Sequence, residues 1–387
     1  MLNSLAIGHY RSLLNLTLAP GQLTVITGAN GSGKSNLYRG LRLLAETAQG
    51  GVINALAREG GLQSTLWAGP EKISGRMRRG EVDIEGGPRK DAVRLRLGFS
   101  TEEFGYAIAL GLPTPSRSAF ALDPEIKREC IWAGPYYRPA SLLVDRNGAL
   151  VRTRSGRSWE VLSQHLSPFD SLFSQIADPQ TTPEVFALRE AIRAWRFYDH
   201  FRTDRDAPAR HPQLGTRTPV LHPDGHDLAA ALQTIREIGD VGALDDAIGD
   251  ALPGTRLNIV FHADTRFGIE LHQTGLLRPL SGMELSDGTL RYLLWVAALL
   301  TPRPPPLMVL NEPETSLHPD LLPALARLII GAARHTQIWV VSHAERLIDA
   351  LHESARCEPI HLEKALGQTL ITGQGLLDGP PWKWPED

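Results

Sequence analysis

The segment Gly28-Ala29-Asn30-Gly31-Ser32-Gly33-Lys34-Ser35 decides how the rest of this 387-residue chain is interpreted. It fits the pattern G-x-x-x-x-G-K-[S/T], with an apolar, strand-like run before it (23–26) and a helix-compatible run after it (36–44). Glycines let the backbone wrap closely around an anion, so that successive N–H groups and a helix N-terminus point at phosphate oxygens. The segment therefore predicts a loop that binds the phosphates of a nucleotide.

The pattern also assigns roles within the loop. Lys34 would reach the β- and γ-phosphates, and the Ser35 hydroxyl would be a magnesium ligand. Arg11, in the turn of a predicted hairpin within residues 1–27, is a further candidate for a phosphate contact, and Tyr10 beside it is a candidate for stacking on adenine. The complete set of expected nucleotide contacts is Asn30, Gly31, Ser32, Gly33, Lys34, Ser35, Asn36 and Arg11.

Composition narrows the class of protein. A hydrophobic share of 42% and a charged share of 21% are ordinary for a globular chain, and a net charge of −3 gives no overall field that favours nucleic acid. Cys130 and Cys357 lie far apart without metal-ligand spacing, which favours a reducing compartment. The longest apolar stretch (290–300) is too short to span a bilayer, and the start lacks a signal-peptide pattern. We expect a cytoplasmic protein with no membrane partner.

The pattern of polar and apolar residues divides the chain into three parts: 1–180, 181–250 and 251–387. The first part has strand patterns at 81–86, 92–99, 106–112, 126–134 and 141–153, with a hairpin turn at Asn147-Gly148, which predicts an antiparallel meander. The second has helical patterns at 183–202 and 227–240. The third combines a short helical pattern with further strands. We therefore expect an α/β fold with a mixed central sheet, a meander lobe and a helical insert.

The insert carries arginines interleaved with aromatic residues. The arginines are Arg193, Arg196, Arg202, Arg205, Arg210 and Arg217; the aromatic residues are Trp195, Phe197, Tyr198 and Phe201. Such a mixture can form a nucleic-acid surface, or it can make internal ion pairs with Asp199, Asp204 and Asp206. The internal arrangement is the favoured interpretation.

Three more motifs follow in a definite order. Leu285-Ser286-Asp287-Gly288-Thr289 precedes an apolar helical run, and it predicts a second anion site at a helix N-terminus. The strand-like run 307–310 leads into Asn311-Glu312-Pro313-Glu314-Thr315-Ser316-Leu317-His318-Pro319, which places Asn311 and Glu312 at the carboxyl end of a strand. Residues 337–341 form another apolar run, which ends in Ser342-His343.

The phosphate loop, LSDGT, NEPETSLHP and VVSHAE, in this order, resemble the ABC-type ATPase heads of the RecF, SMC and OLD class. More narrowly, LSDGTLRY with PPLMVLNEPETSLHPDLL looks like a family of bacterial predicted ATPases of the AAA group. The resemblance implies a P-loop NTPase of ABC-ATPase type. No sustained heptads and no acidic nuclease cluster are visible, so the expectation is a head domain without a coiled coil or nuclease domain.

The resemblance implies roles for single residues. Lys34, Glu312 and His343 would be catalytic: Glu312 would polarise the attacking water and His343 would sense the γ-phosphate. Ser286, Asp287 and Gly288 would form the signature motif that contacts the nucleotide of a second copy. Ser316, Leu317 and His318 would form the D-loop at the dimer seam. The weak magnesium-ligand candidates are Asn311 and Gln175, with Gln164 as the alternative to Gln175.

Asn311 departs from the class, which usually has Asp there. An amide oxygen can accept a proton from a magnesium-bound water but brings no charge, so magnesium affinity falls and hydrolysis slows. The Asn is either native to the subfamily, which the surrounding sequence favours, or a substitution that traps ATP.

The resemblance finally implies a function. Two copies would bury two molecules of MgATP head to tail, and hydrolysis would open the homodimer, as a switch in DNA repair or phage defence that acts on DNA or with a nuclease or toxin partner. The alternative is a module in which ATP drives assembly on a partner effector with little or no turnover.

Overall fold

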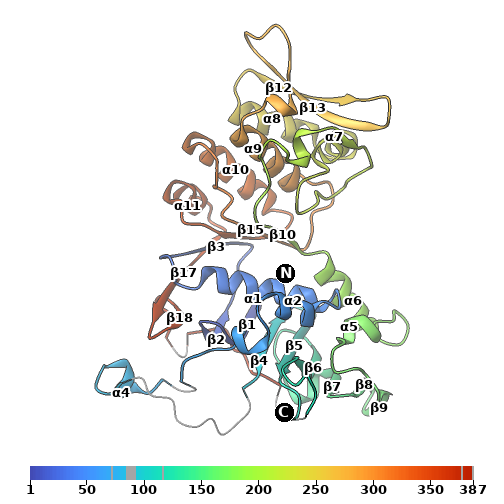
Figure 1. Ribbon diagram of the computed structural model, residues 1–387, viewed down its shortest axis with the longest axis vertical. Helices are drawn as coiled ribbons and strands as arrows, with labels where there is room; N and C mark the ends of the chain where they lie inside the picture. The colour runs from blue at the N-terminus through green and yellow to red at the C-terminus, as the bar shows by residue number, and fades with distance from the viewer. Residues whose placement is uncertain (71–72, 84–92, 116, 376–377, 386–387) are drawn as a thin grey trace. The chain divides into compact units, whose positions relative to one another are not determined.

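The computed structural model describes residues 1–70, 73–83, 93–115, 117–375 and 378–385 (Figure 1). Its contacts divide the chain into two compact units, neither of them continuous in sequence. Unit 1 comprises Met1–Pro20, Gly28–Ala194 and Ile360–Asp387. Unit 2 comprises Gly21–Thr27 and Trp195–Pro359. The chain therefore passes from one unit to the other at four places, and two of these flank a single strand.

Unit 1 is built on an eight-stranded antiparallel sheet in the order β2-β1-β4-β5-β6-β7-β8-β9. The strands are β1 (Ser4–Tyr10), β2 (Leu13–Leu18), β4 (Leu95–Ser100), β5 (Phe104–Gly111), β6 (Glu125–Ala133), β7 (Leu142–Asn147), β8 (Leu150–Ser155) and β9 (Ser158–Ser163). The predicted meander is confirmed, including the turn between β7 and β8. β9 was not predicted, and the pattern at 81–86 gives no strand at 81–83, while 84–86 lie outside the described residues.

Helix α1 (Lys34–Thr47) lies against β1 and β4 of this sheet (Figure 1). The approach is close, because a Cβ added at Gly40 would come within 2.7 Å of Ile7 Cδ1. The other helical segments of unit 1 are α2 (Val52–Arg58), α3 (Leu62–Thr65), α4 (Gly75–Arg78), α5 (Leu172–Gln175), α6 (Pro183–Arg193) and the 3-10 turn Pro139–Ser141. Near the chain end, β18 (Gln368–Ile371) pairs with β17 (Cys357–Ala365), and Trp382 packs edge-on against Trp132 of β6.

Unit 2 is built on parallel strands in the order β10-β15-β16-β3. They are β10 (Arg196–Tyr198), β15 (Leu307–Asn311), β16 (Gln337–Val341) and β3 (Leu23–Gly28), of which residues up to Thr27 group with unit 2. The prediction of one helix over 183–202 is wrong. Helix α6 ends at Arg193, because Tyr198 is fully buried next to β15 and the strand it belongs to completes the sheet.

Helices cover these strands and form the core of unit 2. They are α7 (Leu228–Ile238), α8 (Val241–Ala251), α9 (Asp287–Leu299), α10 (Leu322–Ala332) and α11 (Glu345–His352), with 3-10 turns at Pro208–Arg210, Gly282–Glu284 and Pro319–Leu321. Helix α9 is buried at every position from Leu290 to Leu299, so it is the central helix of the core. A smaller sheet of β11 (Gln213–Leu214), β12 (Thr255–Phe261), β13 (Arg266–Gln273) and β14 (Leu280–Ser281) lies beside α7 and α8 (Figure 1).

The mixed α/β fold with a large antiparallel sheet is confirmed. The division into residues 1–180, 181–250 and 251–387 was drawn from sequence patterns, whereas the two compact units are defined by contacts. The three-part division therefore stays a prediction. None of the described helices has the length and apolar character needed to cross a bilayer.

Candidate functional site

The loop from Gly28 to Ser35 has the backbone that its glycines predict. Gly28, Gly31 and Gly33 have φ values of 144°, 80° and 112°. A Cβ at Gly33 would lie 2.0 Å from Thr369 Oγ1, and one at Gly28 would lie 2.3 Å from the Leu362 carbonyl oxygen. Glycine is therefore required at Gly28 and Gly33 by both conformation and space.

The loop presents groups suited to an anion. Among the described residues no side chain caps the N-terminus of α1 and no acidic residue lies in its first turn, so its leading N–H groups stay available. The Ser32 hydroxyl is buried and has no hydrogen-bond partner within the described structure. The Lys34 ammonium donates to the carbonyl oxygens of Gly28 (2.5 Å) and Ala29 (3.2 Å), within the loop itself. Ser35 is exposed in the first turn of α1, and Asn30 and Gly31 are exposed as well.

A hydrogen-bond chain fixes the loop from behind. Asn36 Nδ2 donates to Ser12 Oγ (2.8 Å), Ser12 Oγ bonds Thr369 Oγ1 (2.7 Å), and Thr369 Oγ1 donates to the Ser32 carbonyl (2.8 Å). Asn36 was expected to contact the nucleotide, but its amide nitrogen instead donates a hydrogen bond within the protein. Sequence reasoning missed Ser12 and Thr369, since neither stands in a motif and Thr369 is 337 positions away from Ser32.

Arg11 also has an internal partner. Its guanidinium donates to Glu59 Oε2 at 2.7 Å, and its φ of 49° shows that it holds the tight turn between β1 and β2. Tyr10 is fully buried and its hydroxyl donates to the same carboxylate oxygen at 2.6 Å. Burial, together with the hydrogen bond to Glu59, raises the pKa of Tyr10. The buried ring is not placed to stack on a base.

In unit 2, polar side chains follow two adjacent parallel strands. Asn311, at the end of β15, pairs with Val341, at the end of β16, and Val341 also pairs with Ile26 of β3. Parallel strands in register end at one edge of the sheet, so Glu312 and His343 follow strand ends at the same edge at which β3 ends. The chain continues from β3 directly into the phosphate loop.

Glu312 and His343 lie close together at this edge. The Glu312 N–H donates to the Val341 carbonyl (2.8 Å), and its φ of 49° turns the chain sharply after the strand. His343 Nδ1 is 3.7 Å from Glu312 Oε1, and the side chains are 57% and 47% exposed. Both groups are thus within reach of a ligand, as general acid–base residues require.

Glu314 is the residue that positions His343. Its buried Oε1 accepts hydrogen bonds from Ser342 Oγ (2.8 Å) and the His343 N–H (3.0 Å), and it lies 3.5 Å from His343 Nδ1. Its Oε2 is buried without a partner among the described groups. The segment after β16 is therefore tied to the segment after β15. In the sequence, the signal for this role was a second glutamate directly after the Glu312-Pro313 pair.

The two other motifs meet around the start of α9. Ser286 Oγ caps this helix by accepting from the Thr289 N–H (3.2 Å), and a Cβ at Gly288 would come within 3.2 Å of the Ser316 carbonyl. The buried Arg291 donates to the Thr315 carbonyl (3.0 Å). Burial lowers the pKa of Arg291. Ser316 and His318 are exposed beside this helix start, whereas Leu317 packs partly against the core.

The magnesium candidates are divided between the units. Ser35 and Gln175 belong to unit 1, where Gln175 is exposed at the end of the short helix α5, while Asn311 belongs to unit 2 and is partly buried. Gln164 is exposed after β9. Ser35 and Asn311 each carry a neutral oxygen donor of the kind that Mg²⁺ accepts, and neither adds charge.

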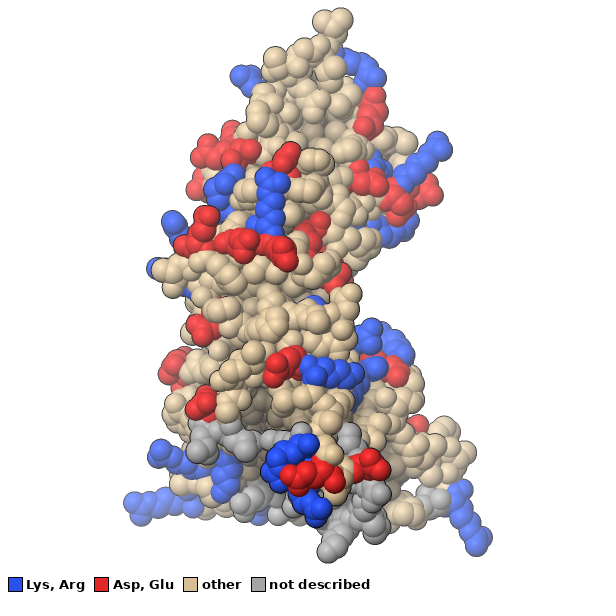
Figure 2. Space-filling view, turned by 90° about the vertical axis from the view of Figure 1, so that its left-hand side faces the viewer, with Lys and Arg blue, Asp and Glu red and all other residues tan. Residues whose placement is uncertain are grey.

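The arginines of the insert mostly make internal contacts. Arg210 is 7% exposed and donates to the carbonyls of Thr203 (2.9 Å) and Leu285 (2.6 Å) and to Asp287 Oδ1 (2.5 Å). Arg202 pairs with Asp204 at 2.8 Å and Arg217 with Glu237 at 3.4 Å. On the face drawn in Figure 2, basic and acidic side chains alternate among the described residues.

Three of the four aromatic residues of the insert are buried. Trp195, Tyr198 and Phe201 are 7%, 0% and 1% exposed. They are therefore unavailable for stacking on bases, and the interpretation of this segment as a structural one is supported.

Comparisons with known proteins agree with these observations. A family model described as "AAA domain, putative AbiEii toxin, Type IV TA system" matches residues 23–349. No curated protein matches the sequence.

Among solved structures, the SMC head bound to the C-winged helix domain of ScpA has a TM-score of 0.52 and 13% identity, covering 97% of this chain and 98% of the other. The SMC head domain from Thermotoga maritima has a TM-score of 0.42 and 14% identity, covering 97% and 99%. The first of these likenesses shows the fold. The chain belongs to the AAA domain family whose model it matches over residues 23–349, and its fold is that of a P-loop ATPase head of the SMC type.

Proposed function

We propose that this protein binds MgATP at the loop Gly28–Ser35 and hydrolyses it, with Glu312 and His343 acting at the γ-phosphate. The observation that carries the proposal is the shared edge at which β3, β15 and β16 end, because one strand leads into the phosphate loop and the others into Glu312 and His343. The family match and the requirement for glycine at Gly28 and Gly33 support nucleotide binding.

The residues present define the chemistry. N–H groups at the start of α1 and the Lys34 ammonium would neutralise the triphosphate, which stabilises the charge that develops during phosphoryl transfer. The Glu312 carboxylate would orient and polarise the attacking water, and His343, held by Glu314, would donate to the γ-phosphate. Mg²⁺, when bound by Ser35 and Asn311, supplies further charge compensation. Since Asn311 is neutral, turnover is slow compared with a site that has a carboxylate there.

We further propose a head-to-tail homodimer. Ser286 is exposed at the N-terminus of α9, where its hydroxyl, the helix dipole and Gly288 favour an anion, and Arg210 offsets the charge of Asp287. The exposed D-loop residues Ser316 and His318 lie beside this helix start. A second copy would place its bound γ-phosphate against this surface, and hydrolysis would release it.

The downstream role follows from class resemblance and from the family description, which names a toxin of a toxin–antitoxin system. We propose a cytoplasmic nucleotide switch in DNA repair or phage defence, with a nuclease, a toxin or DNA as partner. Because Arg210 is structural, a test of DNA binding by charge reversal belongs at the exposed Arg202 and Arg205.

A second candidate function is an assembly module with little turnover, which the neutral Asn311 favours. Steady-state phosphate release by the wild type, Asn311→Asp and Glu312→Gln separates the two. We expect slow release from the wild type, faster release from Asn311→Asp, and at least about a hundredfold less from Glu312→Gln, since a group acting in general acid–base catalysis contributes about 10²–10⁴-fold. If none of the three proteins releases phosphate while ATP still drives assembly, the second candidate function is established instead.

A further inference from the structure

A histidine-rich turn precedes helix α7 in unit 2, with the local sequence Leu221-His222-Pro223-Asp224-Gly225-His226-Asp227. The Gly225 N–H donates to the His222 carbonyl (2.9 Å), which closes the turn, and the His222 N–H donates to Asp227 Oδ1 (3.1 Å). A Cβ added at Gly225, whose φ is +72°, would lie 2.4 Å from Leu294 Cδ2 of α9. The turn is therefore seated directly on the core helix, and its backbone is fixed.

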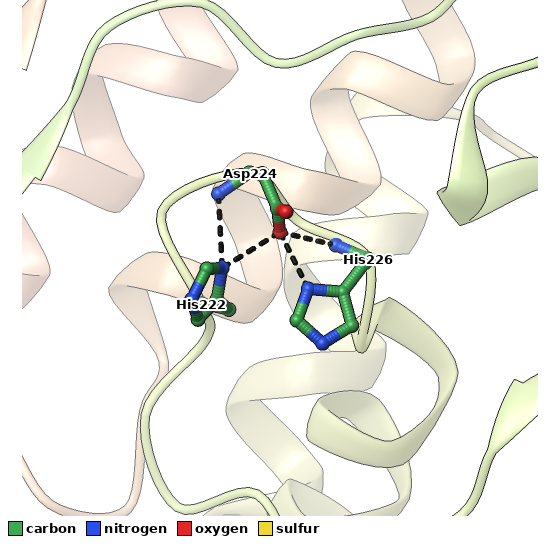
Figure 3. Close-up of side chains that lie close together, drawn as sticks. All are labelled: His222, Asp224 and His226. Carbon is green, nitrogen blue, oxygen red and sulfur yellow. Dashed lines mark hydrogen bonds and ion pairs between the residues drawn. The ribbon is translucent and has the colours of Figure 1, made fainter.

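The turn brings three side chains to one point, as Figure 3 shows for His222, Asp224 and His226. Asp224 Oδ1 is 2.7 Å from His222 Nδ1 and 2.6 Å from His226 Nδ1. The same oxygen is 3.0 Å from the His226 backbone nitrogen. The ligand atoms of the three side chains all lie within 4.8 Å of one another.

Hydrogen bonding alone accounts poorly for this arrangement. Three nitrogens surround one carboxylate oxygen, although one such oxygen offers about two lone-pair directions. The Asp224 N–H also points at His222 Nδ1 at 3.5 Å, a long contact in which Nδ1 is the acceptor. If Nδ1 accepts there, its lone pair also faces the carboxylate, and a cation bound by both atoms, once they rotate slightly apart, would remove their repulsion.

The charge of the cluster indicates the kind of ligand. The Asp224 carboxylate oxygen faces the Nδ1 atoms of both imidazoles and accepts from the His226 N–H. A carboxylate between the imidazoles disfavours an anion. Imidazole nitrogens favour Zn²⁺ and its neighbours in the first transition row, whereas Mg²⁺ and Ca²⁺ prefer oxygen ligands.

We propose that His222, Asp224 and His226 form a binding site for a divalent transition-metal ion of the Zn²⁺ type. Zinc bonds to imidazole nitrogen and carboxylate oxygen are about 2.0–2.2 Å long, so small side-chain rotations bring all three atoms onto one ion. The side chains are 54%, 58% and 43% exposed, which leaves a fourth position open to water. The site does not depend on the phosphate loop or on nucleotide.

Equilibrium dialysis of the full-length protein against Zn²⁺, after treatment with EDTA and with excess Mg²⁺ present, tests the proposal. We expect one zinc per chain for the wild type, and at least a tenfold weaker affinity for His222→Ala, His226→Ala and Asp224→Asn. His335→Ala is the matched control, because His335 is exposed in the turn after α10 and should bind no zinc. Substitution with Co²⁺ should give the visible absorption band of a nitrogen- and oxygen-ligated ion in the wild type and in His335→Ala, but in none of the three ligand variants.

Two further measurements check whether each variant folds and whether zinc binds elsewhere in the protein. The melting temperature of each metal-free variant reports whether it has folded, and zinc should raise the melting temperature of the wild type but not of His222→Ala. Zinc binding that survives in a His222→Ala/His226→Ala double variant would place the ion elsewhere, for instance at His343 and Glu312, and would overturn the proposal. A folded wild type that takes up no more zinc than this double variant would overturn it equally.

Discussion

At the scale of single residues, the glycines of the phosphate loop differ in what they tolerate. Gly33 and Gly31 both have positive φ, but a Cβ at Gly33 would overlap Thr369, whereas a Cβ at Gly31 would meet nothing within 4 Å. Gly31→Ala should therefore cost only the strain of a left-handed alanine, about 1 kcal/mol. Gly33→Ala should cost about 3 kcal/mol, since overlap adds to strain. Urea unfolding of both variants measures the difference, and equal losses would show that the contact with Thr369 is unimportant.

Glu314 gives a second prediction at this scale. Glu314→Ala removes the acceptor that holds Ser342 and His343, so it should reduce the kcat of phosphate release at least tenfold with little change in KM. Glu314→Gln keeps one oxygen in place and should retain most of the activity. Steady-state kinetics on both variants, with unfolding curves as a check on folding, separates positioning from general stability. Wild-type kcat in Glu314→Ala would contradict this role.

These residues also show where sequence reasoning ends. Gly28, Lys34, Glu312 and His343 stand in local motifs, and a motif can be recognised without a structure. Thr369 acts on the loop from far along the chain, and its neighbours carry no pattern. Arg11 and Asn36 are polar residues near the loop, but their partners Glu59 and Ser12 were not visible from local spacing.

At the scale of elements, the start of α9 depends on one buried arginine. Arg210 binds the carbonyls that precede the helix and Asp287 in its first turn. Arg210→Ala leaves these buried carbonyls without donors and should lower the free energy of unfolding by about 3 kcal/mol. Arg202→Ala, in the same loop but exposed and paired with Asp204, should change the free energy of unfolding little, because solvent screens an exposed ion pair. Denaturant unfolding of the two variants checks this, and similar losses would show that Arg210 does not support α9.

Elements were predicted well where pattern and packing agree. The meander strands alternate in polarity and pair with their neighbours in sequence, so a local pattern was enough. Residues 196–198 keep the helical spacing of α6, yet they form β10, because pairing with β15 buries Tyr198 more completely. That competition involves a strand more than a hundred positions away, which no local pattern reveals.

At the scale of the whole molecule, the proposed homodimer predicts a charge effect at Ser286. Ser286→Asp and Ser286→Asn both keep a residue that caps α9, so both should fold. Only Asp would set a negative charge against the partner's triphosphate. In a Glu312→Gln background with MgATP, light scattering after size-exclusion chromatography should show dimers for the Asn variant and monomers for the Asp variant. Dimers in both would exclude this surface from the nucleotide interface.

The contact between Thr369 and the phosphate loop also affects the order in which the protein is made. Ribosomes synthesise Ser32 long before the threonine that holds its carbonyl, because Thr369 of β18 lies 337 positions further along the chain. A nascent chain therefore first carries an incomplete loop, and we expect ATP binding to begin only after β18 has left the ribosome. A message cut short before β18 would thus yield a protein with every recognisable motif and a poorly formed nucleotide pocket.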